Sequence, residues 1–281
     1  MREPLKAAIC QMLVSDDKND NLSHAGEMIY EASKRQAQMI ILPEIFNGPY
    51  QTELMAENAE IFPGKTTSFL SDLSRKNKII LVGGSIPEKD EAGKIYNSSY
   101  VFDEQGNLIG KHRKMHLFDI DIPGQIYFKE SDVFTAGNSL QIIRHKDLTF
   151  AVIICYDIRF PELARLAALE GAQLLIVPAA FNLTTGPAHW ELLIRTRAVD
   201  NQLFVIAASP ALNPAASYHA WGHSMAADPW GTVIDEGKTG EEIIYVQLDL
   251  SIINKVRREL PLMQHRRNDI YQFNYQANHN E

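Results

Sequence analysis

The stretch Leu148-Thr-Phe-Ala-Val-Ile-Ile-Cys155-Tyr-Asp-Ile-Arg159-Phe-Pro161-Glu162 joins an apolar run to a polar, proline-marked segment. The run is rich in β-branched residues, so it predicts a buried strand. Pro161 is typical of the first turn of a helix, and a helix is predicted from there to Gly171. Cys155 is therefore expected between a strand and a helix, at the carboxyl edge of a sheet, where ligands approach.

A reactive cysteine acts through its thiolate and needs a base and a positive charge close to it. The apolar run MIILP ends in Glu44 much as the first run ends in Cys155, and Glu44 is the candidate base. Lys114 follows a predicted hairpin, residues 96–102 and 108–113, and is the candidate cation. Taken singly, Cys155 also fits a structural thiol, Glu44 a surface or helix-capping acid, and Lys114 a solvated lysine.

Together, Glu44, Lys114 and Cys155 lie within LPEIF, HRKMHLFD and CYDIRFPEL, an ordered set that resembles the nitrilase superfamily of carbon-nitrogen hydrolases. The similarity extends from about Leu5 to Tyr271. The segments FNLTTGPAHWE, RTRAVDN, AWGHS and DPWG resemble the omega-amidase branch of that superfamily. The resemblance implies an α-β-β-α four-layer sandwich whose subunits pair through helices, as a homodimer or a higher homo-oligomer.

The activity that the resemblance implies is hydrolysis of the terminal amide of small dicarboxylic acid monoamides, such as 2-oxoglutaramate and 2-oxosuccinamate. The acyl group would pass through a thioester on Cys155, with Glu44 moving the proton in both directions. Lys114 and the backbone N–H of Tyr156 would stabilise the oxyanion. Glu130 matches a supporting glutamate of the family, although a solvated carboxylate is the simpler interpretation from sequence alone. No cofactor and no metal are expected.

An omega-amide carries a distal carboxylate, which needs a planar cation or several hydrogen-bond donors when it is buried. Arg159 is the candidate for that contact, and an ion pair with a neighbouring acid such as Asp157 or Glu162 is the alternative. The remaining candidates for the wall of the substrate pocket are Tyr50, Phe181 and Thr185.

The composition is that of an ordinary globular protein: 281 residues, of which 45% are hydrophobic and 22% charged. Alternating strand and helix patterns favour the α/β class, and no linker or repeat divides residues 1–281, so a single domain with a C-terminal tail at about 262–281 is predicted. The formal net charge of −8 argues against nucleic-acid or membrane-surface binding. Neither a secretory leader nor a membrane span is predicted, which makes a cytoplasmic location the expectation.

Further elements are predicted from periodicity and turn residues. The predicted helices cover residues 22–32, 67–76 and 189–198; the predicted strands cover residues 5–12, 39–42, 79–83, 174–177 and 203–208, with a hairpin of 222–227 and 232–235.

Competing functions remain open from the sequence. A Cys-His protease would use His189 or His223 as its base, but neither has a matching local signature. The pairs His112/His116 and His219/His223 have a spacing found in metal sites, but no accompanying motif supports zinc. Within the superfamily, an amidase acting on deaminated glutathione is the second candidate, and nitrile hydrolysis is a weaker one. A metabolite-binding protein of the same fold is the non-enzymatic alternative.

Overall fold

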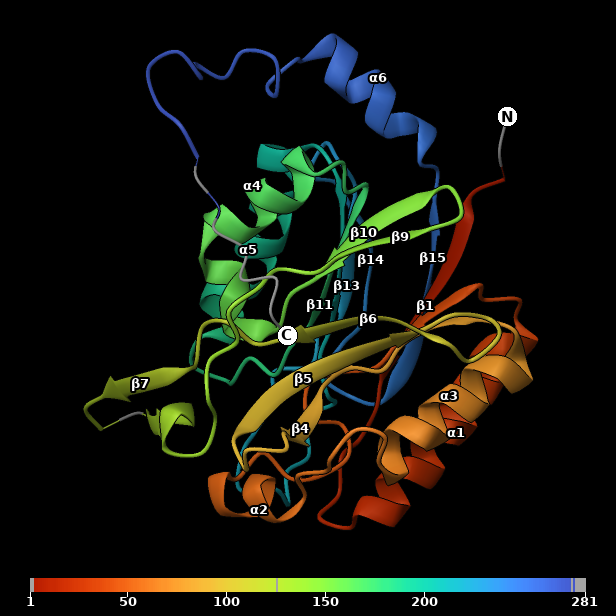
Figure 1. Ribbon diagram of the computed structural model, residues 1–281, viewed down its shortest axis with the longest axis vertical. Coiled ribbons are helices and arrows are strands. Elements are labelled where there is room, and N and C mark those ends of the chain that lie inside the picture. The colour runs from red at the N-terminus through yellow and green to blue at the C-terminus, as the bar shows by residue number, and fades with distance from the viewer. Residues whose placement is uncertain (1–2, 125, 274, 276–281) are drawn as a thin grey trace.

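The computed structural model describes residues 3–124, 126–273 and 275. Two β-sheets lie face to face, and helices cover the outer face of each, so the molecule has four layers (Figure 1). The predicted α/β class and the α-β-β-α sandwich are confirmed.

The first sheet has seven strands, and the amino-terminal part of the chain forms most of it. Its order is β15 (Glu242–Leu248), β1 (Leu5–Gln11), β2 (Met39–Ile41), β3 (Ile80–Val82), β5 (Ile95–Phe102) and β4 (Ile86–Lys89), with β6 (Leu108–Arg113) also pairing with β5. β1, β2 and β3 are parallel, whereas β5 and β6 form the predicted antiparallel hairpin. Helices α1 (Lys18–Lys34) and α3 (Lys65–Asn77) lie on the outer face of this sheet (Figure 1).

The second sheet has six strands, and its centre is parallel. Its order is β14 (Val233–Glu236), β13 (Met225–Ala227), β12 (Phe204–Ala208), β11 (Leu174–Pro178), β10 (Leu148–Val152) and β9 (Ile142–His145). Helices α4 (Pro161–Leu169) and α5 (Gly186–Asn201) cover its outer face. The predicted strand before Cys155 and the predicted helix after it are therefore both present.

Apolar side chains fill the space between the sheets. The inner face of the first sheet contributes residues such as Ile9, Ile41 and Val82, and the second sheet contributes Phe150 and Ile176. These strands have apolar side chains on both faces, because each sheet also packs against helices. That double burial explains why their sequences are continuous apolar runs rather than alternating patterns.

Several short elements were not predicted. They are α2 (Thr52–Glu57), β4, β9, β15, the hairpin of β7 (Asp119–Ile122) and β8 (Ile126–Lys129), and α6 (Ser251–Glu259). Most of them are short or partly exposed, so their sequences lack a long periodic apolar pattern. The predicted hairpin of residues 222–227 and 232–235 is confirmed, but its first strand begins only at Met225.

The C-terminal tail lies against its own chain over the part that the structure describes. Arg165 donates a hydrogen bond to the sulfur of Met263 at 2.9 Å, and the backbone N–H of Leu140 donates to the Tyr275 hydroxyl at 2.5 Å. Figure 1 shows this segment crossing from α6 toward α4. The predicted tail also includes residues 274 and 276–281, which lie outside the described residues.

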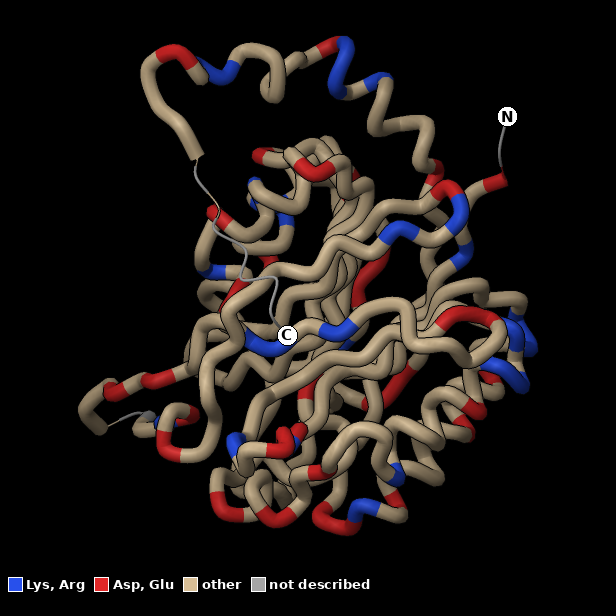
Figure 2. The backbone as a smooth tube through the Cα atoms, in the orientation of Figure 1, with Lys and Arg blue, Asp and Glu red and all other residues tan. Residues whose placement is uncertain are grey.

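Charged residues are distributed over helices and loops, and Figure 2 shows lysines and arginines interspersed with acidic residues along the backbone. Within the described part of the chain, no helix is both long enough and apolar enough to span a membrane.

Candidate active site

Three loops at the ends of strands bring the predicted catalytic side chains together. Glu44 follows β2, Lys114 follows β6 and Cys155 follows β10, so both sheets contribute to one site. Nζ of Lys114 lies 2.8 Å from Oε1 of Glu44. Burial raises the pKa of Glu44, and Lys114 and the neighbouring Cys155 thiol oppose this effect. The predicted convergence of these three residues is therefore present in the structure.

Glu44 is held by the first sheet. Asn97 on β5 donates a hydrogen bond to Oε1 of Glu44 at 2.9 Å, the same oxygen that Lys114 contacts. Oε2 of Glu44 is buried and has no hydrogen-bond partner among the described residues. One carboxylate oxygen is therefore anchored while the other is left to exchange protons with the thiol or with a bound molecule.

A close approach of two loops fixes the backbone on either side of Glu44. A Cβ atom on Gly84, whose φ is +56°, would lie only 2.0 Å from the carbonyl oxygen of Pro43. Only glycine lets the loop after β3 approach so closely. The Ser85 hydroxyl in that loop accepts a hydrogen bond from the backbone N–H of Ile45 at 3.1 Å.

Lys114 is fully buried between two carboxylates. Besides Glu44, its Nζ contacts Glu130, at 2.9 Å from Oε1 and 2.8 Å from Oε2. Burial lowers the pKa of Lys114, but Glu130 and Glu44 more than offset this and raise the pKa well above its ordinary value. The lysine is thus a fixed ammonium group, and the solvated alternative is wrong.

Glu130 is also buried, so the interpretation of it as a surface carboxylate is wrong. It begins a short 3-10 helix, Glu130–Asp132, directly after β8. The Tyr50 hydroxyl donates to its Oε1 at 2.9 Å, and the backbone N–H of Phe118 donates to its Oε2 at 2.6 Å. Tyr50, which was predicted to line the pocket, thereby connects the pocket wall to the lysine.

Cys155 begins a 3-10 turn, Cys155–Arg159, that separates β10 from α4. Its φ is +47°, a left-handed conformation that is unusual outside glycine, and its side chain is 5% exposed. Such strain is often found where a nucleophile is presented on a sharp turn. The backbone N–H of Tyr156 follows the sulfur directly in the chain.

Burial favours the neutral thiol of Cys155. Burial raises its pKa well above the ordinary value, and the negative charge of Glu44 adds to this effect. Lys114 and a hydrogen bond from the backbone N–H of Ala180 act in the opposite direction, because they stabilise the thiolate. Burial also raises the pKa of Glu44, with Lys114 opposing it. A proton can therefore pass from sulfur to carboxylate without leaving the buried cluster.

Asp157 joins the cysteine turn to the lysine loop. Its carboxylate accepts a hydrogen bond from the backbone N–H of Ile154 at 3.0 Å and another from that of His116 at 2.9 Å. The rings of His112 and His116, on either side of Lys114 in the chain, lie 3.1 and 2.8 Å from its two oxygens. Burial raises the pKa of Asp157, but the hydrogen bonds with the two histidines lower it to well below the ordinary value. The carboxylate thus fixes the separation between the two loops.

Arg159 lies beside the nucleophile and pairs with no carboxylate among the described residues, so the ion-pair alternative is wrong. Its guanidinium stacks over the Phe181 ring at 4.8 Å, and one of its nitrogens lies 3.2 Å from Nδ1 of His189. Burial lowers the pKa of Arg159, and a negative charge on Cys155 would oppose this effect. An unpaired, half-buried guanidinium next to aromatic rings is a suitable contact for a carboxylate. The Thr185 hydroxyl, by contrast, lies 3.2 Å from Oδ1 of Asn182 in its own loop.

The histidines make other contacts. His189 is exposed and contacts Arg159, whereas Nδ1 of His223 lies 2.9 Å from Oε1 of Glu236. Cys155 thus has Glu44, rather than an imidazole, as its neighbouring acid-base group. In the described part of the chain, no cluster of three or more histidine, cysteine, aspartate or glutamate side chains has metal-binding geometry.

Comparison with known proteins agrees with this geometry. Residues 6–258 match the carbon-nitrogen hydrolase family. The chain belongs to this family. Omega-amidase NIT2 of Danio rerio is 49% identical to this hydrolase over 269 residues, which are 96% of this chain and 97% of that protein. Omega-amidase NIT2 of Homo sapiens is 47% identical over 266 residues, 95% of this chain and 96% of that protein.

A solved relative has the same fold. Saccharomyces cerevisiae Nit3, a member of branch 10 of the nitrilase superfamily, is 46% identical and superposes on this hydrolase with a TM-score of 0.88. The match covers 95% of this chain and 98% of that one. The resemblance to the nitrilase superfamily, and the four-layer sandwich that it implied, are thereby confirmed.

Sequence reasoning missed several groups of the site in this hydrolase. Asn97, Asp157 and Tyr218 all contact the catalytic cluster or the elements that carry it. Asn97 lies in a strand whose polar residues, Asn97-Ser-Ser99, gave no signal for a site. Tyr218 lies in the long loop after β12, where spacing predicts nothing about position.

Proposed function

We propose that the protein is an omega-amidase that hydrolyses the terminal amide of small dicarboxylic acid monoamides, including 2-oxoglutaramate and 2-oxosuccinamate. The observation that carries the proposal is the buried cluster of Glu44, Lys114 and Cys155. The Arg159 guanidinium lies on the next turn of the chain and pairs with no carboxylate among the described residues. Relatives named omega-amidase that are similar over nearly the full length support the same substrate class.

In the first half-reaction, Glu44 accepts the thiol proton while the sulfur attacks the amide carbonyl. The oxyanion that forms is stabilised by the Lys114 ammonium and by the backbone N–H of Tyr156; one such donor typically contributes about 3 kcal/mol. Glu44 then gives the proton to the departing nitrogen, which leaves as ammonia. The acyl group remains on Cys155 as a thioester.

In the second half-reaction, Glu44 removes a proton from water, and the resulting hydroxide attacks the thioester carbonyl. The same two donors stabilise the second oxyanion, and the dicarboxylate leaves as the thiol is restored. Glu130 supports this chemistry through its contacts with Lys114 and Tyr50. No step requires a metal or a cofactor.

The test is an assay of purified protein with 2-oxoglutaramate, deaminated glutathione, glutamine and simple nitriles. We expect rapid ammonia release from 2-oxoglutaramate, and none above background from the Cys155→Ala variant. Release of cysteinylglycine from deaminated glutathione at a higher kcat/KM would favour the second candidate of the family. Turnover by Cys155→Ala would contradict the thioester route altogether.

A second prediction concerns substrate binding by Arg159. Phe181 and Tyr50 are proposed to form the neighbouring walls of the substrate pocket, and Thr185 is a further candidate for that wall. Arg159→Lys should raise KM for carboxylate-bearing amides about tenfold, because a point charge replaces a two-pronged contact. KM for neutral amides of similar length should change much less. Initial rates with glutaric acid monoamide and with butyramide measure both values, and equal effects would exclude the carboxylate contact.

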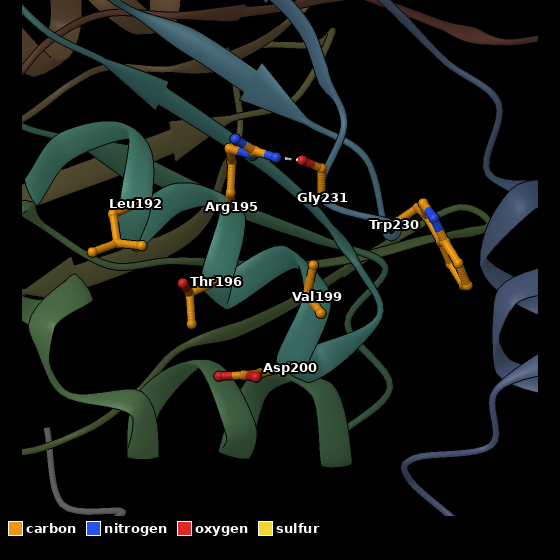
Figure 3. A pocket seen from close by; sticks show the side chains of 7 residues that line it. All are labelled: Leu192, Arg195, Thr196, Val199, Asp200, Trp230 and Gly231. Carbon is orange, nitrogen blue, oxygen red and sulfur yellow. Dashed lines mark hydrogen bonds between the residues drawn. The ribbon is translucent and has the colours of Figure 1, made fainter.

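Homodimerisation through the outer helices is part of the proposal. Leu192 on α5 and Trp230 on the turn before β14 are 65% and 60% exposed and line one groove (Figure 3). Arg195 fixes the groove by donating to the carbonyl of Gly231 at 2.8 Å. Large exposed apolar side chains that share a groove are typical of protein interfaces. Sedimentation of the purified protein tests this assembly.

The organisation of residues 1–281 as one domain is also a proposal, supported by the apolar cluster between the sheets, to which both sheets contribute. The cytoplasmic location stays a prediction from the sequence.

A further inference from the structure

The candidate base, Glu44, lines a small pocket. Its lining includes Glu44, Ala180, Tyr50 and Tyr218, and its volume is about 40 Å³. The backbone N–H of Ala180 reaches the sulfur of Cys155, so the pocket borders the place where the scissile bond must lie. A volume of this size holds ammonia or a few water molecules.

A much larger groove lies on the other side of the same two tyrosines. It is lined by Tyr50, Tyr218, Tyr127 and Phe128, among others, and its volume is about 420 Å³. Because Tyr50 and Tyr218 line both spaces, their rings form a wall between the groove and the pocket of Glu44. The ring centroids are 4.5 Å apart, and Phe128 supports them at 5.3 Å from Tyr50 and 6.0 Å from Tyr218.

The Tyr50–Tyr218 pair lies next to the position expected for the leaving nitrogen of the substrate. Glu44 must give its proton to the departing nitrogen, so that nitrogen and any group attached to it face the pocket that Glu44 lines. Arg159, the contact for the distal carboxylate, lines neither the pocket nor the groove. A substituent on the nitrogen therefore meets the tyrosine pair, which lines the pocket beside Glu44.

We propose that Tyr218, packed against Tyr50, restricts this enzyme to primary amides by leaving room for ammonia but not for a larger amine. The inference rests on the proposed amidase function. Tyr218 is the replaceable half of the wall: its hydroxyl donates to the carbonyl of Ala180 at 2.5 Å, and its ring contacts other aromatic rings. Tyr50 is less suitable for substitution because its hydroxyl donates a hydrogen bond to Glu130, which also contacts Lys114.

The test compares glutaric acid monoamide with its N-methyl and N-butyl derivatives, with the glutarate formed as the common readout. Tyr218→Ala joins the pocket to the groove and should raise the ratio of kcat/KM for the N-butyl amide to that for the primary amide by about tenfold or more. Tyr218→Phe retains the ring and should leave the ratio within about threefold of the wild-type value. Tyr30→Ala removes an exposed tyrosine on α1 and should leave the ratio unchanged.

Each ratio is measured within one preparation, so a reduced fraction of folded enzyme cancels. An unchanged ratio in Tyr218→Ala overturns the proposal, as does an equal shift in Tyr218→Phe. Tyr218→Val provides a second opening of the wall, and loss of all turnover in both variants would make Tyr218 a structural group and also overturn it. A wild-type enzyme that forms no glutarate from the primary amide would instead contradict the amidase function itself.

Discussion

Lys114→Met should lower the free energy of unfolding at pH 8 by about 3–5 kcal/mol, since it leaves buried carboxylates without their cation. The ammonium is within 2.9 Å of both Glu44 and Glu130, and none of the three side chains is accessible to solvent. Methionine is similar in length and apolar, so the loss would reflect charge rather than volume. Turnover should fall by about 10²–10³, because an oxyanion donor is lost. Urea unfolding and ammonia release measure the two effects.

The stability that Lys114→Met loses relative to wild type should be smaller at low pH than at high pH. Lys114 lowers the pKa of Glu44, so its removal raises a pKa that burial has already raised. A carboxyl whose folded pKa exceeds its unfolded value stabilises the folded state at low pH, and this contribution is lost as pH rises. The difference between wild type and Lys114→Met should therefore narrow as pH falls from about 8 toward about 5. A pH-independent difference would contradict the role of Lys114 as counter-charge.

Lys111→Met is the matched control. Lys111 lies three residues earlier and also contacts a buried glutamate, Glu88, at 3.0 Å. Glu88 keeps a second cation, Arg113, at 2.8 Å, and Lys111 is partly exposed. We expect Lys111→Met to cost only about 0–1 kcal/mol. An equal loss in both variants would mean that any lysine in this strand and loop contributes the same stability.

The strand order could not be derived from the sequence, but the edge at which the site lies could. Leu148–Val152 and Met39–Ile41 are continuous apolar runs because each strand is covered on both faces, and the polar residue that ends each run marks the strand's exit. Cys155 and Glu44 were identifiable for that reason. Their membership of one site required the resemblance, since the runs belong to different sheets.

The supporting groups lacked such signals. Glu130 follows a short strand of an isolated hairpin, and its burial depends on Lys114, 16 residues away in the chain. Asp157 looks from the sequence like an acid beside Arg159, yet its partners are His112 and His116, more than 40 residues away. Polar contacts between distant segments leave no periodicity in a sequence, whereas buried apolar faces do.

Glu44→Gln should lower kcat by about 10³ or more, because it removes the carboxylate that accepts the thiol proton in the proposed mechanism. The amide oxygen of glutamine can still accept the hydrogen bonds that Asn97 and Lys114 donate to Oε1. The change therefore retains the shape and most contacts of the site while removing its capacity to take the thiol proton. Ammonia release under saturating substrate measures the loss.

His189→Asn separates this result from a cysteine-histidine mechanism. Its ring lies beside Arg159, so the variant should retain most of kcat and show a moderate rise in KM for carboxylate-bearing amides. The opposite pattern, in which His189→Asn is inactive and Glu44→Gln retains turnover, would assign the base to the imidazole. Burial raises the pKa of the Cys155 thiol and that of Glu44 in the same direction, which favours transfer of one proton between these two groups. The base must take the proton from sulfur and then give it to the departing ammonia, so it must lie next to both atoms. His189 is exposed and lies beside Arg159, at the proposed site of the distal carboxylate, so it cannot serve both steps.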